Sequence, residues 1–115
     1  MWDKKGENLT YRFLRLLTEQ SAGKRALIIG DSQGGSNATG GALASILSGA
    51  GYNVVNKSKY GSYTAQAANQ VPDTNFDLVI LFTGGHFKSK PGDALKIAKM
   101  FPSTTKFIIS GPPPV

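Results

Sequence analysis

The sequence predicts an α/β domain with a mostly parallel, open sheet of about four strands and helices on both of its faces. Short, apolar, β-branched runs stopped by glycine or polar residues alternate with segments that have helical spacing of their apolar side chains. Strands that alternate with helices need crossover connections, which are right-handed and make the strands parallel. The length of 115 residues fits one such domain.

Each element has its own local signal along the chain. The four expected strands are short apolar runs, at residues 25–30, 52–56, 77–83 and 106–110. The four expected helices lie between or before them, at residues 8–20, 41–50, 64–70 and 91–100. Gly49 and Gly51 close the second helix, Pro72 follows the third, and Pro91 suits the first turn of the fourth. The resulting order is α-β-α-β-α-β-α-β, with residues 1–23 as a helical extension before a domain at residues 24–115.

Composition excludes several classes of protein. Apolar residues make up 40% and charged residues 17%, which is ordinary for a folded domain and unlike a disordered chain. There is no cysteine, and the single histidine and scattered acids have no metal-ligand spacing, so we expect no disulfide, metal or cofactor. No apolar run approaches the roughly 18 residues that span a bilayer, and no signal peptide is recognisable, which predicts a soluble protein.

The charge of the chain points to no particular partner. Its net charge is +6, but the lysines are scattered and no aromatic residues alternate with them. A solvated basic surface explains this better than a nucleic-acid-binding face, and we expect no membrane partner. The sequence fits two locations equally, namely the cytoplasm and a virus particle or another assembly.

Polar, glycine-rich segments follow all four expected strands. They begin at Gly30, Lys57, Thr83 and Gly111. Because the carboxyl ends of parallel strands meet at one edge, where open α/β sheets bind ligands, these four segments are expected to form the site. In the first of them, Ser32 stands between a buried strand and a helix, a position that suits a nucleophile. The plain alternative for Gly30-Asp31-Ser32 is a turn that caps the helix.

These residues together resemble the SGNH (GDSL) hydrolases. The resemblance covers residues 24–115 and consists of Gly30-Asp31-Ser32 after the first strand, Gly61 after the second, Gly84-Gly85-His86 after the third and the proline-rich exit 111–114 after the fourth. It implies a flavodoxin-like, three-layer fold, of which this sequence holds the front part and is therefore truncated. It also implies that Ser32 is the nucleophile and that the backbone N–H groups of Ser32 and Gly61 stabilise the oxyanion.

Two departures from the family pattern affect the expected chemistry. His86 stands where the family has an asparagine that donates to the oxyanion, and a ring N–H could replace that amide only with altered geometry. The family's Asp-x-x-His motif, which supplies the general base, occurs nowhere in the 115 residues. His86 could itself act as the base only with a carboxylate such as Asp93 to orient it. Without a base, this chain should be inactive or nearly so.

Auxiliary roles are expected for residues beside these positions. Asp31 is expected to brace its loop through backbone N–H groups rather than to act chemically. Tyr60 and Tyr63 flank Gly61 and are the aromatic side chains best placed to touch a ligand.

Three classes of function follow from these residues. The first is a serine esterase acting on a carbohydrate, lipid or other small-molecule ester, whose remaining catalytic residues are not in this sequence. The second is a non-catalytic binding or structural module within a larger assembly such as a virion, with other subunits covering the open sheet. The third is a phosphate-binding loop at residues 34–41, which is weakened because neither glycine-rich nucleotide motif is present.

Overall fold

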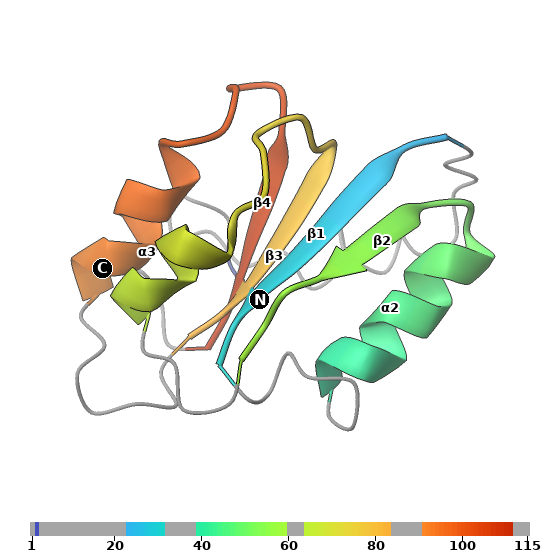
Figure 1. Ribbon diagram of the computed structural model, residues 1–115, viewed down its shortest axis with the longest axis horizontal. Coiled ribbons are helices and arrows are strands. Elements are labelled where there is room, and N and C mark those ends of the chain that lie inside the picture. Colours follow the sequence, from blue (N-terminus) through green and yellow to red (C-terminus); the bar gives the residue numbers. More distant parts are fainter. Residues whose placement is uncertain (1, 3–22, 32–38, 60–63, 84–90, 112–115) are drawn as a thin grey trace.

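The apolar runs of the sequence form the strands of one parallel sheet. The computed structural model describes residue 2 and residues 23–31, 39–59, 64–83 and 91–111, and Figure 1 shows their arrangement. The sheet has four strands in the order β2-β1-β3-β4, and each neighbouring pair is parallel. The strands are β1 (Arg25–Gly30), β2 (Asn53–Asn56), β3 (Leu78–Phe82) and β4 (Lys106–Ser110). The predicted fold class, an open parallel α/β sheet, is confirmed.

Three helices are present in the part of the chain that the structure describes. They are α2 (Thr39–Gly49), the 3-10 helix η2 (Thr64–Gln70) and α3 (Pro91–Ala98). The sequence predicted the positions of all three, but not that residues 64–70 take the tighter 3-10 form, which at seven residues is longer than most 3-10 helices. The predicted helix at residues 8–20 lies outside the described residues. No described helix has the length and apolar character needed to cross a bilayer.

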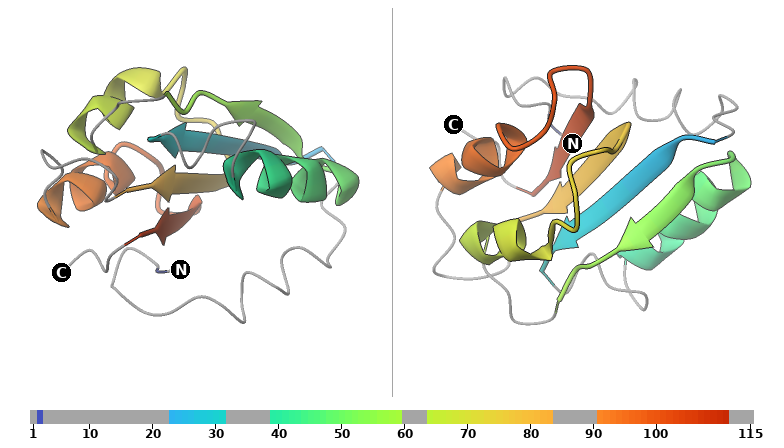
Figure 2. Two further views of the ribbon diagram at one scale, coloured as in Figure 1. Left: turned by 90° about the horizontal axis from the view of Figure 1, so that it is seen from below. Right: turned by 45° about the horizontal axis from the view of Figure 1, so that its top comes forward.

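Alternating side chains of the strands build a core on each face of the sheet. One face packs against α2, where Ile28 and Ile80 of the sheet and Leu47 of the helix all have exposures of 1% or less. The other face packs against η2 and α3, through Ile29, Leu81, Ala67 and Ile97 among others. Figures 1 and 2 show α2 beside β2, with η2 and α3 together on the opposite side. Because β1 and β3 lie inside the sheet, both of their faces are buried, which explains their uninterrupted apolar sequences.

The outer edge of β4 is paired with the second residue of the chain. Trp2 forms an antiparallel bridge with Ile109, in which Trp2 N–H donates to the Ile109 carbonyl at 3.0 Å and Ile109 N–H donates to the Trp2 carbonyl at 2.8 Å. The indole N–H of Trp2 also donates to the Gly111 carbonyl at 2.9 Å. Residue 2, which the sequence placed in a separate extension, therefore contacts the sheet directly and satisfies part of an otherwise open strand edge.

Candidate active site

The strand order places a topological switch point between β1 and β3. From β1, the chain crosses to β2 on one side of the sheet and afterwards to β3 and β4 on the other side. The register aligns Gly30 with Phe82 and Phe82 with Ser110, so these strands end on the same rung. In an open α/β sheet, the crevice outside this point is where ligands bind. The residue after the end of β1 is Asp31, and the residue after the end of β3 is Thr83.

Gly30 brings β1 and β3 very close together as β1 ends. Its φ is +124°, a conformation that residues with a side chain rarely adopt. A Cβ on Gly30 would lie 2.8 Å from the Phe82 nitrogen and 2.9 Å from the Phe82 carbonyl carbon, and closer still to the Phe82 oxygen. The glycine is therefore required both by its conformation and by the space around it.

Asp31 extends this close contact between the two strands. Its N–H donates to the Phe82 carbonyl at 3.3 Å, and the residue is 6% exposed. The chain thus leaves β1 from a buried, hydrogen-bonded position, one residue before Ser32. The predicted bracing role of the Asp31 side chain stays a prediction.

The side chain of Gln70, at the end of η2, forms hydrogen bonds with Gly30 on the side that faces away from β3. Gly30 N–H donates to Gln70 Oε1 at 2.7 Å, and Gln70 Nε2 donates to the Gly30 carbonyl at 3.1 Å. That carbonyl also accepts a hydrogen bond from the backbone N–H of Lys59 at 3.1 Å. Sequence reasoning missed Gln70, since a glutamine at the end of an expected helix matches no motif.

A second close-contact glycine lies where β4 ends. Gly111 has a φ of +139°, and a Cβ there would lie 2.7 Å from the Thr83 hydroxyl oxygen. Thr83 N–H donates to the Ser110 carbonyl at 2.9 Å, which continues the β3-β4 pairing past the end of the strands. The carboxyl ends of β1, β3 and β4 are therefore closely packed and hydrogen-bonded to one another. We call these three strand ends the platform, since a rigid scaffold of this kind is what positions functional segments.

The predicted site residues follow directly from this platform. Ser32, Gly61 and His86 lie outside the described residues, as do Tyr60 and Tyr63. The structure describes residues that precede each group: Asp31 before Ser32, Lys59 before Tyr60, and Thr83 before Gly84. Gly30 and Lys59 are joined by a hydrogen bond, and Gly30 is paired with Phe82, so the segments leaving β1, β2 and β3 start from one edge of the sheet. The roles of the three site residues stay predictions.

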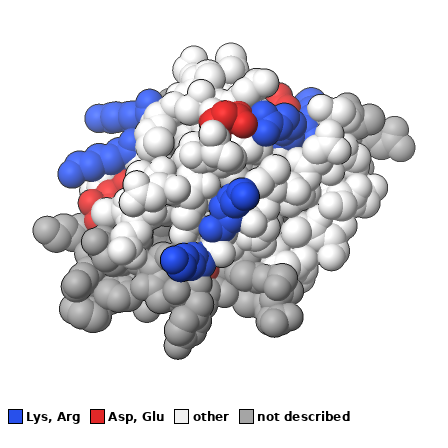
Figure 3. Space-filling model, viewed as in Figure 1, with Lys and Arg blue, Asp and Glu red and all other residues white. Residues whose placement is uncertain are grey.

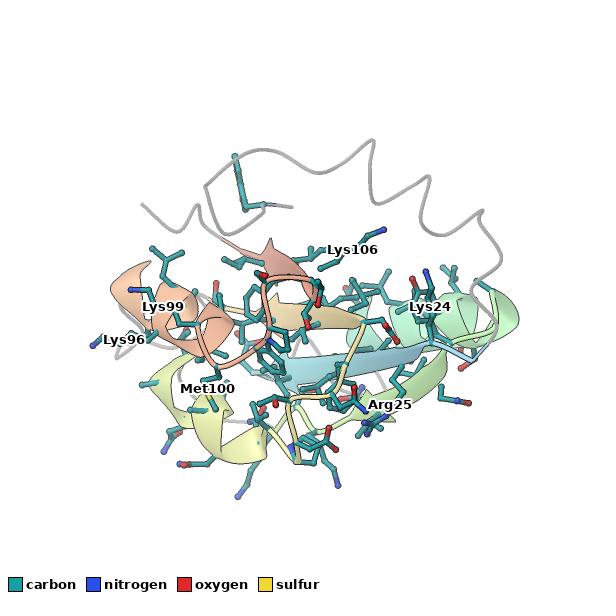
Figure 4. The ribbon with its side chains drawn as sticks, turned by 90° about the horizontal axis from the view of Figure 1, so that it is seen from above. Lys24, Arg25, Lys96, Lys99, Met100 and Lys106 are labelled. Atoms are coloured by element: carbon teal, nitrogen blue, oxygen red, sulfur yellow. The ribbon has the colours of Figure 1, made fainter. Side chains whose placement is uncertain are left out.

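Five of the described cations lie at the edge of the sheet opposite this platform, whereas Asp31, Lys57 and Lys59 lie at the carboxyl ends of β1 and β2. Figure 4 shows this edge, where the cations stand beside the starts of β1 and β4 and the end of α3: Lys24, Arg25, Lys96, Lys99 and Lys106. The carboxylates nearby are Asp73 and Asp77. Figure 3 shows cations and carboxylates interspersed on another face of the molecule. No described group of His, Cys, Asp and Glu side chains could hold a metal ion.

Arg25 and Asp73 form a bidentate ion pair at the edge of the sheet where β1 and β4 begin. The two guanidinium nitrogens of Arg25 donate to the Asp73 oxygens at 3.0 and 3.1 Å, and the guanidinium lies 4.2 Å from the centre of the Phe76 ring. The hydrogen bond from Arg25 lowers the pKa of the Asp73 carboxyl, and the backbone N–H of Asn75 lowers it further. The same pair raises the pKa of Arg25. Both side chains are partly exposed, at 34% and 47%, so the pair contributes modestly to stability.

This lowered pKa predicts a small pH dependence of stability. A carboxyl with a lower pKa in the folded state stabilises the fold above its ordinary pKa of 3.8, and the contribution is lost as the pH falls through the folded value. Asp73→Asn keeps an acceptor for the Asn75 N–H but removes the charge. We expect the variant to melt below the wild type at neutral pH, and the two melting temperatures to converge in acid. Thermal melts across this range test it, and a difference that does not change with pH would contradict it.

A shallow apolar groove of about 320 Å³ lies along α3, away from the platform. Its described lining residues are Leu95, Ala98, Lys99, Phe101 and Ser103. It contains none of the residues at the carboxyl ends of the strands, so its position does not bear on the candidate site.

The fold and the site together define a flavodoxin-like α/β domain with its candidate site at the β1/β3 switch point. In comparisons with known proteins, no family model, curated protein or solved structure matches the chain.

Proposed function

We propose that this chain carries the nucleophile and oxyanion groups of a serine ester hydrolase of the SGNH type. The observation that carries the proposal is the restrained end of β1 at the switch point of the sheet, formed by Gly30 and Asp31, the two residues before Ser32 in the sequence. A serine that follows a rigid strand end can be held in place for attack on an ester carbonyl. The resemblance at Gly61 after the second strand and at Gly84 and Gly85 after the third supports the same proposal from the sequence.

Each proposed group has one role in the reaction. The Ser32 hydroxyl attacks the ester carbonyl and forms an acyl-serine as the alcohol leaves. The backbone N–H groups of Ser32 and Gly61, with a ring N–H of His86, stabilise the negative charge that develops on the carbonyl oxygen. A general base must accept the Ser32 proton, and the 115 residues contain no Asp-x-x-His motif to provide it. Fast turnover therefore requires a base from outside this sequence.

A non-catalytic module is the second candidate function. It is favoured by two features of the sequence, namely the missing Asp-x-x-His motif and the histidine at position 86 in place of the family's asparagine. In this case the platform would serve binding or assembly, and the Ser32 hydroxyl would have no special reactivity.

Covalent labelling separates the two candidates. The protein from its native source is treated with a fluorophosphonate, which phosphonylates activated serines with loss of fluoride, and its intact mass is compared with the 12.2 kDa of this sequence. The esterase proposal expects one label, on the peptide that contains Ser32. Labelling of Ser32 no faster than that of Ser58, a serine after β2, would favour the non-catalytic module.

A further inference from the structure

The end of β1 extends past the strand that should cover its side. β2 pairs with β1 only from Arg25–Asn53 to Ile28–Asn56, and Lys57 N–H donates the next hydrogen bond to the Ile28 carbonyl at 2.8 Å. Beyond that point, Lys59 N–H donates to the Gly30 carbonyl at 3.1 Å, but the Gly30 N–H faces the same side and still needs an acceptor. The side-chain amide of Gln70 accepts from the Gly30 N–H and donates to the Gly30 carbonyl, as a peptide group of a neighbouring strand would.

The backbone at Gly30 is restrained on both sides. On the β3 side, the bond from Asp31 N–H to the Phe82 carbonyl is long, at 3.3 Å. On the other side, the bonds to Gln70 are 2.7 and 3.1 Å. Glycine is the residue with the greatest backbone freedom, so its conformation here depends on these partners. The Gln70 side chain therefore supplies two of the hydrogen bonds that restrain the backbone leading to Ser32, beside the bond from Lys59 N–H to the Gly30 carbonyl and the pairing with β3.

Gln70 is itself fixed by the packing of its helix. η2 lies against β1 and α3, and Ala67, three residues before Gln70, is fully buried in the same core cluster as Leu27 and Ile29. The amide is therefore presented to Gly30 from an element that is anchored on the sheet.

We propose that Gln70 is a positioning residue, whose side-chain amide fixes Gly30 and Asp31 and thereby sets the direction and reactivity of Ser32. The part of this inference that concerns Ser32 depends on the proposed function, whereas the part that concerns the backbone does not. The two bonds from the Gln70 amide to Gly30 make its proposed action one that passes through the strand end.

Hydrogen exchange of the Gly30 amide tests the backbone part. Gln70→Ala removes both hydrogen bonds, and we expect the Gly30 N–H to exchange about tenfold faster or more than in the wild type, measured by NMR. Asn69→Asp, an exposed change in the same helix, is the matched control and should leave that rate unchanged. Equal Gly30 exchange in the wild type and in Gln70→Ala would overturn the proposal.

Gln70→Glu gives a readout that depends on pH. A neutral carboxyl can accept from Gly30 N–H and donate to the Gly30 carbonyl, as the amide does. An ionised carboxyl has no proton for that carbonyl and repels it. The charged residues on the elements that border η2 and Gly30 include Asp31 after β1, Lys59 after β2 and Asp93 in α3; a nearby aspartate disfavours ionisation of the new carboxyl and a nearby lysine favours it. We therefore expect Gln70→Glu to show fast Gly30 exchange at neutral pH and near-wild-type exchange in mild acid.

Phosphonylation of Ser32 tests the part that concerns reactivity. If the wild type is labelled at Ser32, Gln70→Ala should be labelled about tenfold more slowly or worse, whereas Asn69→Asp should match the wild type. Labelling of Gln70→Ala at the wild-type rate would overturn the role of Gln70 but leave the proposed esterase standing. If the wild type is not labelled at all, the proposed function fails, and Gly30 exchange alone decides whether Gln70 holds the backbone.

Discussion

Gly30→Ala is expected to destabilise the domain by about 3 kcal/mol or more, and to lower Tm by roughly 10 °C or more. Two costs add at this position. A φ of +124° is strained for any residue with a side chain, and the new methyl group would collide with the backbone of Phe82. Relief of that collision requires β1 to move away from β3, which breaks the pairing at the centre of the sheet.

Two other glycines separate these costs. Gly23 has a φ of +81° but open space where a Cβ would lie, so Gly23→Ala should cost only about 1 kcal/mol of strain. Gly49, at the end of α2, has open space and no positive φ, so Gly49→Ala should be neutral or stabilise the fold by up to about 1 kcal/mol.

Chemical denaturation of the three variants and the wild type measures their free energies of unfolding. The expected order of stability is Gly49→Ala, then Gly23→Ala, then Gly30→Ala. If Gly30→Ala were no less stable than Gly23→Ala, the close approach of β1 to β3 would be contradicted.

Ser32→Ala is expected to reduce kcat/KM for a small aryl ester by roughly 10³-fold or more in the protein from its native source. Under the proposed function, the Ser32 hydroxyl forms the acyl intermediate, and no other group can replace it. The loss should appear mainly in kcat, because the ester-binding contacts remain.

Ser58→Ala is the control for this change. Ser58 lies just after β2, where its hydroxyl and N–H both bond to the Asn56 side-chain oxygen, which gives it a local structural role. Its removal should leave ester turnover unchanged. Turnover that survives Ser32→Ala would exclude a Ser32 esterase and leave the binding or assembly module as the better account.

The types and order of the described elements could be read from local patterns. The runs at residues 25–30 and 106–110 were predicted with the boundaries that the structure has, because β-branched apolar residues ended by glycine have few other stable conformations. The predicted strand at 77–83 is one residue shorter at each end, and the helix at 91–100 ends at Ala98. Such differences are expected where the ends of elements depend on their neighbours.

The candidate site was predictable only in part. That polar segments follow the strands at one edge required nothing beyond the alternation of strands and helices. Gly30 could be recognised as the end of a strand, but not as a point of contact with Phe82, which is far along the chain. Gln70 could not be recognised as a partner of Gly30 either, because the two residues are 40 positions apart in the sequence. A glutamine amide can bond to almost any polar group, so its sequence position does not reveal its partner.

The sequence by itself determined the fold class, the parallel sheet and the place of Ser32 after the first strand, because these depend on periodicity and on glycine and proline, which act locally. Only the tertiary structure decided the strand order β2-β1-β3-β4 and the close contact of Gly30 with Phe82. The same is true of the hydrogen bonds between the Gln70 amide and Gly30 and of the pairing of Trp2 with Ile109. Each of these joins residues distant in sequence, and the packing of helices against both faces of the sheet determines which distant groups meet.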